Sequence, residues 1–231
     1  MTRAVSTGPN GALSGEEVKA LVDPVTQTSV ETAVTDLVSS IRENIQVRRS
    51  HKISTNSGDS ILKGYIHSSV VSGEVSMGKI GSLVQVDVEP TEGWNVEGVE
   101  ALGHKLAMHA AAASPKYLDE KSVPVEDLER EQSIYIDQAK AEGKPEKVIQ
   151  GIVKGRTKKF YEQHAFLNQP FIFEEEGAKS QSVAQVLVKG AKDHGSEKLS
   201  LTDFVRFEVG EGQEAAENDF AAEVASMSKG N

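Results

Sequence analysis

The segment from Gly81 to Glu89 alternates apolar and polar residues, and this pattern restricts the fold more than any other feature of the chain. Val84, Val86 and Val88 share one side of an extended strand, and the residues between them are polar. Strands with one apolar face are typical of antiparallel sheets that are covered on a single side. The helical stretch 96–113, whose apolar stripe is rich in small residues, suits that covering role. The two segments predict an α+β fold, an antiparallel sheet packed with helices.

Other segments carry the same two kinds of pattern. The stretch 204–209 alternates apolar and polar residues until glycines end the run. A helix is expected over 30–44 because its apolar residues recur at helical spacing, so Leu37 and Val38 should face the core. The remaining expected elements are strands at 46–50 and 60–67, helices at 16–22 and 183–188, and a loop at 69–76.

Between residues 124 and 167 the sequence is highly charged and carries only a thin apolar seam at helical spacing. Such a seam is typical of two helices that pack against each other in antiparallel fashion. Gly143-Lys144-Pro145 supplies a turn between them. The sequence therefore predicts a protruding antiparallel helical hairpin, an arm on the body of the protein.

A last amphipathic stretch lies at the C-terminal end, where Ala216, Phe220, Val224 and Met227 form one helical stripe. Two interpretations stay open for this helix. The stripe packs on the core, as is common for amphipathic helices, or it serves as a C-terminal docking helix for another protein. Both hold if the helix uses different faces for the two contacts.

Composition restricts the kind of partner. The 231 residues carry a formal net charge of −10, whereas nucleic acid phosphates require clustered Lys and Arg, so we expect protein partners and no nucleic acid. The absence of cysteine excludes disulfides and thiolate metal sites. No apolar run reaches the ~18 residues that a membrane helix needs, so no membrane contact is expected. Residues 1–15 lack the hydrophobic core of a secretory signal and are expected to form a flexible tail.

Motifs of catalysis and of nucleotide binding are missing from the sequence. Gly78-Lys79-Ile80-Gly81 has neither the spacing nor the hydroxyl of a phosphate loop, and no nucleophile elbow marks a catalytic serine. His104 and His109 are five residues apart, about 140° around a helix axis, whereas a metal-binding pair needs about one turn. The sequence predicts no enzyme, no cofactor, no metal site and no direct binding of nucleotide.

Several short motifs follow one another in a characteristic order. They begin at 42–49 with Arg-Glu-Asn-Ile-Gln-Val-Arg-Arg and end with the segments 202–212 and 219–229. Between these lie Gly64-Tyr65-Ile66-His67, Gly78-Lys79-Ile80-Gly81-Ser82-Leu83-Val84, Ala107-Met108-His109-Ala110-Ala111, Gly143-Lys144-Pro145, Gly155-Arg156-Thr157-Lys158-Lys159-Phe160 and Asn168-Gln169-Pro170-Phe171. In order and spacing the chain resembles the translation elongation factor Ts family.

The resemblance implies a guanine-nucleotide exchange factor, which promotes GDP release from the GTPase elongation factor Tu during translation elongation. In that family the histidine of the Tyr-x-His motif contacts the third domain of the GTPase, and the terminal helix contacts its nucleotide-binding domain. The motif places this role on His67, for which the plain alternative is a polar residue at a strand end. The residues expected at the partner-binding surface are Tyr65, His67, Met108, His109, Phe220, Val224 and Met227.

The chain departs from the family at its N-terminal side, and we expect a member that is N-terminally shortened. Family proteins carry a half-core that ends in Thr-Asp-Phe-Val, whose Asp-Phe pair helps to release GDP. Thr35-Asp36-Leu37-Val38 and Thr202-Asp203-Phe204-Val205 are similar, but neither is expected to act as that wedge. The alternative function is a partner that binds and stabilises elongation factor Tu with weak or no exchange activity. A more distant alternative is a scaffold subunit of another assembly.

We expect six segments along the chain. They are a flexible tail at 1–15, a helical remnant of the N-terminal half-core at 16–45, the first part of the core subdomain at 46–115, the helical hairpin arm at 116–168, the completion of the core at 169–212 and a C-terminal helical module at 213–231. The extra loop after His67 resembles mitochondrial members, whereas the arm and the terminal helix resemble bacterial and plastid ones. The expected location is the mitochondrial matrix or the bacterial cytoplasm, with a plastid as a third option.

Overall fold

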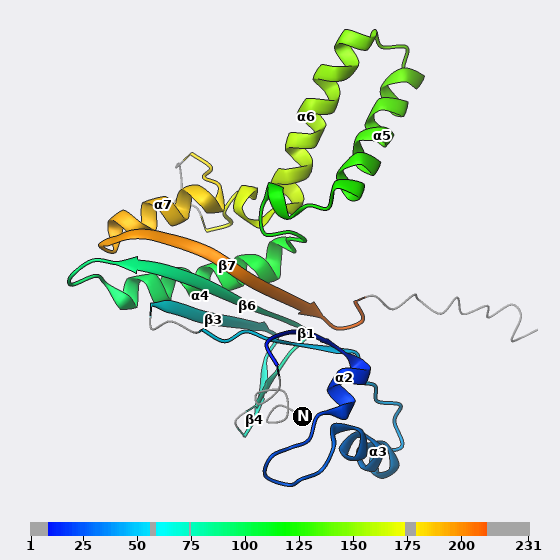
Figure 1. The fold of residues 1–231 in the computed structure, drawn as a ribbon, viewed down its shortest axis with the longest axis vertical. Coiled ribbons are helices and arrows are strands. Elements are labelled where there is room, and N and C mark those ends of the chain that lie inside the picture. The colour runs from blue at the N-terminus through cyan, green and yellow to red at the C-terminus, as the bar shows by residue number, and fades with distance from the viewer. Residues whose placement is uncertain (1–8, 56–58, 74, 174–178, 212–231) are drawn as a thin grey trace, which may run out of the picture.

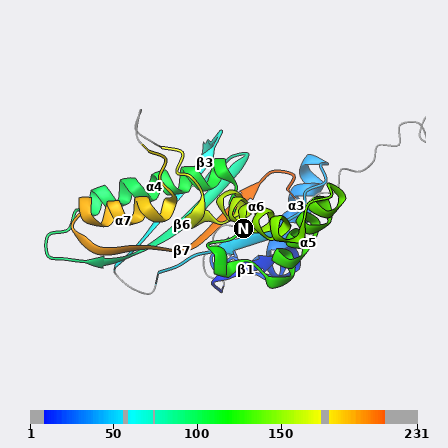
Figure 2. The same ribbon diagram turned by 90° about the horizontal axis from the view of Figure 1, so that it is seen from above.

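The computed structural model describes residues 9–55, 59–73, 75–173 and 179–211. Its centre is a three-stranded antiparallel sheet in the order β3-β6-β7 (Figure 1). The strands are β3 (Ser60–His67), β6 (Ile80–Pro90) and β7 (Ser196–Glu208). Helices α4 (Val96–Ala113) and α7 (Val183–Asp193) cover one face of this sheet, as Figure 2 shows. Helices and antiparallel strands in one core confirm the predicted α+β class.

The buried face of β6 forms the middle of the core. Val84, Val86 and Val88 are buried in one cluster with Val99 and Leu106 of α4, which confirms the predicted alternation. The 3-10 turn η2 (Phe166–Asn168) adds a large aromatic side chain to the same cluster. Burial of apolar surface at about 25 cal/mol per Å² makes this cluster the main stabilising element of the fold.

Helix α4 starts and stops where its sequence predicts. The side chain of Asn95 accepts a hydrogen bond from the Gly98 N–H at the first turn, a standard N-cap. At the other end Ser114 takes a left-handed conformation, and Pro115 follows. These two signals explain why the predicted bounds 96–113 match the observed helix.

Two long helices extend from the body of the protein in Figure 1. They are α5 (Val125–Ala141) and α6 (Glu146–His164), which lie side by side and are preceded by the 3-10 turn η1 (Glu120–Ser122). Few of their side chains are buried, namely Ala139, Ile149 and Phe160. The guanidinium of Arg156 lies 5.5 Å from the centroid of the Tyr135 ring, so a cation–π contact reinforces the narrow seam.

A small N-terminal lobe precedes the sheet. It contains strand β1 (Gly11–Ser14), helices α2 (Gly15–Ala20) and α3 (Val30–Ile41), and strand β2 (Arg49–Lys52), which pairs with β1. The expected tail at 1–15 is therefore wrong for residues 11–14, and the strand expected at 46–50 starts later. Strand β1 escapes prediction because it has only four residues and exists through pairing with a distant segment.

Helix α3 is shorter and less buried than predicted. It ends at Ile41 because Arg42 takes a left-handed backbone conformation, with φ of 59°. Val30 is its only buried residue, and Leu37 is 46% exposed. The prediction that Leu37 faces the core is therefore wrong, because the described part of the lobe offers too few apolar residues to cover it.

The segment expected as a loop at 69–76 forms a short ribbon instead. Strands β4 (Val70–Ser72) and β5 (Val75–Met77) pair antiparallel and keep the register of β3 and β6, since His67 faces Ile80 and Val70 faces Met77. The sheet hairpin thus continues past a break at 68–69 and 78–79.

Helix α7 and strand β7 also extend beyond the predicted ranges 183–188 and 204–209. In the described residues no helix combines the length and apolar character needed to cross a bilayer.

Candidate partner-binding surface

Two side chains stand at the end of β3 on the helix-covered face. The hydroxyl of Tyr65 lies 3.2 Å from Nδ1 of His67. The Tyr65 ring also meets the ring of His104 on α4 edge-on, with centroids 6.0 Å apart. When the hydroxyl donates to Nδ1, the imidazole keeps its proton on Nε2. Since His67 is exposed, it then offers an N–H donor to another protein.

The backbone around His67 fixes where this donor sits. Strand β3 ends because Ser68 takes a left-handed conformation with φ of 53°. The N–H of Lys79 then donates to the His67 carbonyl over 3.2 Å. A side chain at Gly78 would bring its Cβ to 2.5 Å from that carbonyl oxygen, so only glycine allows this close crossing. The histidine is therefore held at a defined kink rather than on a free loop.

A concavity of about 300 Å³ opens beside these two residues. Its wall joins β3 to the C-terminal half of α4, through Met108, and to the loop after η2, through Phe173. The remaining lining residues are Ile80, Ala111, Ala112, Ile172 and Arg206. The structure thus brings the predicted residues Tyr65, His67 and Met108 together in one mostly apolar hollow with polar groups on its rim.

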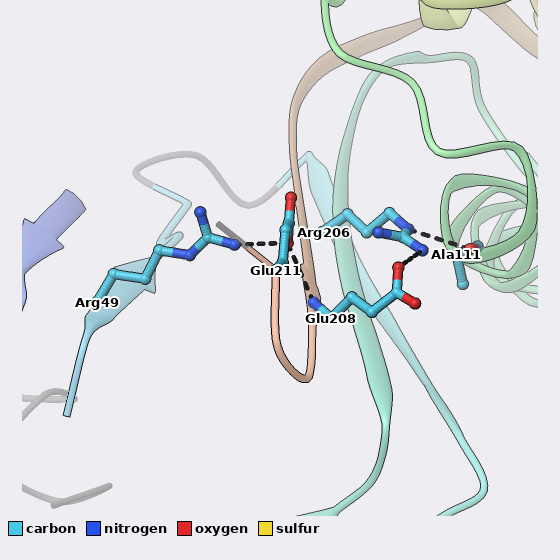
Figure 3. Close-up of polar contacts among 5 residues, drawn as sticks. All are labelled: Arg49, Ala111, Arg206, Glu208 and Glu211. Carbon is cyan, nitrogen blue, oxygen red and sulfur yellow. Dashed lines mark hydrogen bonds and ion pairs between the residues drawn. The ribbon is translucent and has the colours of Figure 1, made fainter. Parts of the chain in front are cut away.

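Arg206 is a member of this surface that the sequence analysis missed. It faces Ser82 across the sheet, and Ser82 faces Tyr65, so the three lie in one row. Its Nε donates to the Ala111 carbonyl over 3.1 Å, and its Nη2 lies 2.6 Å from the Glu208 carboxylate (Figure 3). Burial to 12% exposure and these two bonds hold the guanidinium still. The register of the three strands, had it been known, would have placed Arg206 on this surface.

Comparisons with known proteins give the chain its family. The sequence model of the Elongation factor TS family matches residues 10–211. That is most of the chain. The chain belongs to the elongation factor Ts family.

Individual relatives agree with this assignment. Elongation factor Ts of Rhodospirillum rubrum is 41% identical over 203 residues, which make up 87% of this chain and 60% of that protein. Elongation factor Ts of Magnetococcus marinus is 37% identical over 221 residues, or 96% of this chain and 67% of that protein. The protein of the same name from Bartonella quintana is 38% identical over 215 residues, with 93% and 66% covered. The chain thus spans between 60% and 67% of the length of these relatives.

One predicted contact residue of this elongation factor Ts family member is in the core. His109 is fully buried, and its ring stacks on Phe166 with centroids 5.4 Å apart. The expectation that His109 lies at the partner surface beside Met108 is therefore wrong. Neighbouring helical residues point about 100° apart, so only one of the two can face the hollow.

The polar atoms of His109 are satisfied inside the protein. Its Nδ1 accepts from the Ile172 N–H over 3.4 Å, and its Nε2 lies 3.0 Å from the Gln169 Oε1. This pattern matches a neutral imidazole that donates through Nε2. Burial lowers the pKa of His109 below its ordinary value, and the hydrogen bond with Gln169 opposes that shift only in part.

The lowered pKa of His109 makes stability depend on pH. The unfolded chain binds a proton on this histidine more readily than the folded chain. The free energy of unfolding therefore rises with pH until the pH reaches the ordinary pKa of histidine. The His109 contribution is complete above the ordinary value of 6.5 and falls as the pH drops below it. We expect urea midpoints to fall between pH 7 and pH 5, and to fall less in His109→Gln. Parallel slopes in the two proteins would contradict this assignment.

The two family-like Thr-Asp-x-Val sequences both lie inside regular elements. Thr35–Val38 forms part of helix α3, and 202–205 forms part of β7. Phe204 packs edge-on against Phe166, with centroids 5.0 Å apart, and Asp203 lies 3.7 Å from Nε2 of His51. The first sequence has Leu37 in place of phenylalanine, and in the second Phe204 packs at the core while the Asp203 side chain is 46% exposed.

The remaining predicted contact residues, Phe220, Val224 and Met227, lie outside the described residues. Among the residues that are described, no group of three or more His, Asp or Glu side chains is arranged to hold a metal ion. His104 and His109 differ in environment, since the first is exposed beside Tyr65 and the second is in the core. The hollow beside His104 is mostly apolar, with the exposed His67 and the Arg206 guanidinium among its lining residues.

Proposed function

We propose that this chain binds elongation factor Tu and accelerates the release of its GDP, as an exchange factor of translation elongation. The observation that carries the proposal is the hollow at the end of β3, in which Tyr65, His67 and Met108 of the family motifs lie together. The chain acts by protein binding and carries out no bond-making chemistry. It takes no cofactor, and its partner, not the chain itself, holds the nucleotide.

The hollow suits an apolar anchor side chain from the partner. Its volume of about 300 Å³ accommodates one or two side chains, and interfaces concentrate their binding energy in such pockets. On the rim, the exposed His67 N–H favours a partner carbonyl or carboxylate oxygen, whereas Arg206 is already paired with Glu208 and forms part of the wall. The matching surface on the GTPase is thus an apolar residue beside a hydrogen-bond acceptor.

Further parts of the proposed architecture belong to the same function. Helices α5 and α6 form an antiparallel hairpin that projects as an arm. Phe220, Val224 and Met227 lie on a C-terminal docking helix that contacts the nucleotide-binding domain of the GTPase. Together with the hollow, this helix gives two separate contacts on one partner, which multiplies their affinities.

Exchange requires more than affinity. The chain accelerates GDP release only if it binds the nucleotide-free GTPase more tightly than the GDP-bound form. The coupling is reciprocal, so GDP weakens binding of the chain by the factor by which the chain weakens binding of GDP. Measurements of both affinities therefore test the mechanism as well as the partner.

Replacing His67 by alanine is expected to weaken binding to elongation factor Tu about tenfold, because a hydrogen-bond donor at an apolar anchor site is lost. A binding titration measures the affinity, and stopped-flow release of a fluorescent GDP analogue measures exchange. The matched control is His194→Ala, which removes a half-buried histidine that does not line the hollow. Equal losses in the two variants would contradict the proposed contact.

One observation favours the alternative of binding without exchange. The Phe204 ring of the Asp-Phe sequence at 203–204 packs edge-on against Phe166 at the core, so it is not available as a wedge. Tight binding of elongation factor Tu with unchanged GDP release would establish this alternative. Faster release would establish exchange.

A further inference from the structure

The N-terminal lobe carries an open apolar groove. A hollow of about 630 Å³ runs between α3 and the segment 45–48 that leads into β2. Its apolar wall consists of Val34 and Val38 from the helix and Ile45 and Val47 from the segment. Polar residues of α2 and α3 line its rim. Among the described residues, none fills this space.

Helix α3 needs a cover that the described chain does not provide. Its apolar stripe continues past the groove with Leu37 and Ile41, which are 46% and 48% exposed. In the described residues the buried core of the lobe consists of Leu13, Val18 and Val30, with Leu21, Val34 and Val47 partly buried against it. An isolated helix of 12 residues is marginal in water, and packing of its apolar face supplies most of its stability. Val30 and Val34 pack on the lobe core, whereas Leu37 and Ile41 leave the rest of this apolar face uncovered by the described residues.

The described chain ends next to this groove. Glu211, its last residue, accepts from the Arg49 Nη2 over 2.6 Å and from the Glu208 N–H over 3.2 Å (Figure 3). Arg49 also lies over the Phe207 ring at 4.6 Å, so two contacts hold β2 against the end of β7. The groove wall includes Val47 and Arg48, the two residues before Arg49. The last described residue is therefore linked through Arg49 to the segment that lines the groove.

We propose that the groove holds the chain's own C-terminal segment, with residues 216–231 as an amphipathic helix that packs along α3. The apolar stripe of Ala216, Phe220, Val224 and Met227 spans 12 residues, about 18 Å of helix, which is also the length of α3. The four residues 212–215 reach up to about 14 Å when extended, enough to turn the helix into the groove. The other terminal segment, 1–8, fits less well, because its apolar residues are only Met1, Ala4 and Val5.

This contact competes with the partner. This step rests on the proposed function, in which the residues that fill the groove in the free chain are those that dock on the GTPase in the complex. The closed chain must then open, and its apparent affinity falls by the fraction of open molecules. The contact itself does not depend on that function, and it is tested in the free chain.

The absence of native cysteine gives a direct test. We introduce Ser39→Cys on the groove rim together with Ala221→Cys beside Phe220, and treat the free chain with a short bismaleimide. The matched control pairs Ala221→Cys with Ser133→Cys, an exposed serine on α5, which lies at the opposite end of the molecule from α3 (Figure 1). We expect intramolecular cross-linking at least tenfold faster for the Ser39 pair, read by mass spectrometry of monomers. Equal rates for the two pairs would overturn the proposal.

Cross-linked dimers at the Ser39 pair would also overturn the proposal, because they would show that a second copy occupies the groove. A second measurement does not use the added cysteines. In Phe220→Ser with Val224→Ser, hydrogen-exchange protection of α3 should fall at least tenfold while that of α4 is unchanged. Unchanged protection of α3 would refute the contact. Because no GTPase is present, neither result depends on whether the chain promotes exchange.

Discussion

Replacing Phe166 by alanine is expected to lower the free energy of unfolding by about 3–5 kcal/mol, the usual cost of removing a large buried aromatic side chain. Phe166 is fully buried in the main core. Its ring stacks on His109 and meets Phe204 edge-on, with centroids 5.4 Å and 5.0 Å away. The substitution therefore empties a space shared by η2, α4 and β7, which neighbouring side chains cannot easily fill.

Urea unfolding followed by circular dichroism measures this loss for Phe166→Ala. The control is Val188→Ala on α7, which removes an apolar side chain that is 60% exposed, and we expect a change below about 0.5 kcal/mol. A loss below about 1.5 kcal/mol for Phe166→Ala would show that the site collapses around the cavity. In that case η2 does not anchor the helices to the sheet as its contacts indicate.

The long elements could be predicted because their signals are local. Strand β3 and helix α4 have the predicted bounds, and the buried valines of β6 follow the predicted alternation. Each has a repeated apolar pattern, and α4 has clear capping residues as well. Local signals of this kind do not depend on which distant segments pack nearby.

The short strands could not be predicted because they depend on pairing. Strand β1 has four residues and β4 and β5 have three each, too few for a pattern to stand out. Strand β7 shows a subtler difficulty. Its register against β6 shifts by one residue between Gln85 and Val86, so the alternation changes phase near Thr202. As a result Phe204 and Arg206 share the face that Tyr65 and Ser82 occupy.

The candidate surface was predicted in part for the same reason. The family motif identified Tyr65 and His67, which lie two residues apart on one strand and necessarily share a face. It could not separate Met108 from His109, because a motif on a helix contains residues that point in different directions. Arg206 required knowledge of the register across three strands. Motifs therefore located the surface, and the structure decided its members.

The buried network around Gln169 is where the arm, helix α4 and the loop 169–173 meet. The Gln169 amide nitrogen donates to the Gln163 carbonyl over 2.7 Å and to the Ala113 carbonyl over 3.1 Å. Its oxygen accepts from the His109 imidazole over 3.0 Å. Gln169 is 2% exposed, so its side chain makes these bonds inside the fold. The Gln169 side chain thus supplies hydrogen-bond partners to a carbonyl at the end of α6, a carbonyl at the end of α4 and the imidazole of His109.

Replacing Gln169 by leucine is expected to lower the free energy of unfolding by about 2–4 kcal/mol, although leucine has a similar size. The reason is that a buried imidazole N–H and two part-buried carbonyls lose their partner, and each unsatisfied buried group costs about 1–3 kcal/mol. Urea unfolding at pH 7 measures the loss, with the exposed arm substitution Gln150→Leu as its control. A loss no larger than that of the control would mean that the three groups find other partners. The junction of arm and core would then be held by apolar packing alone.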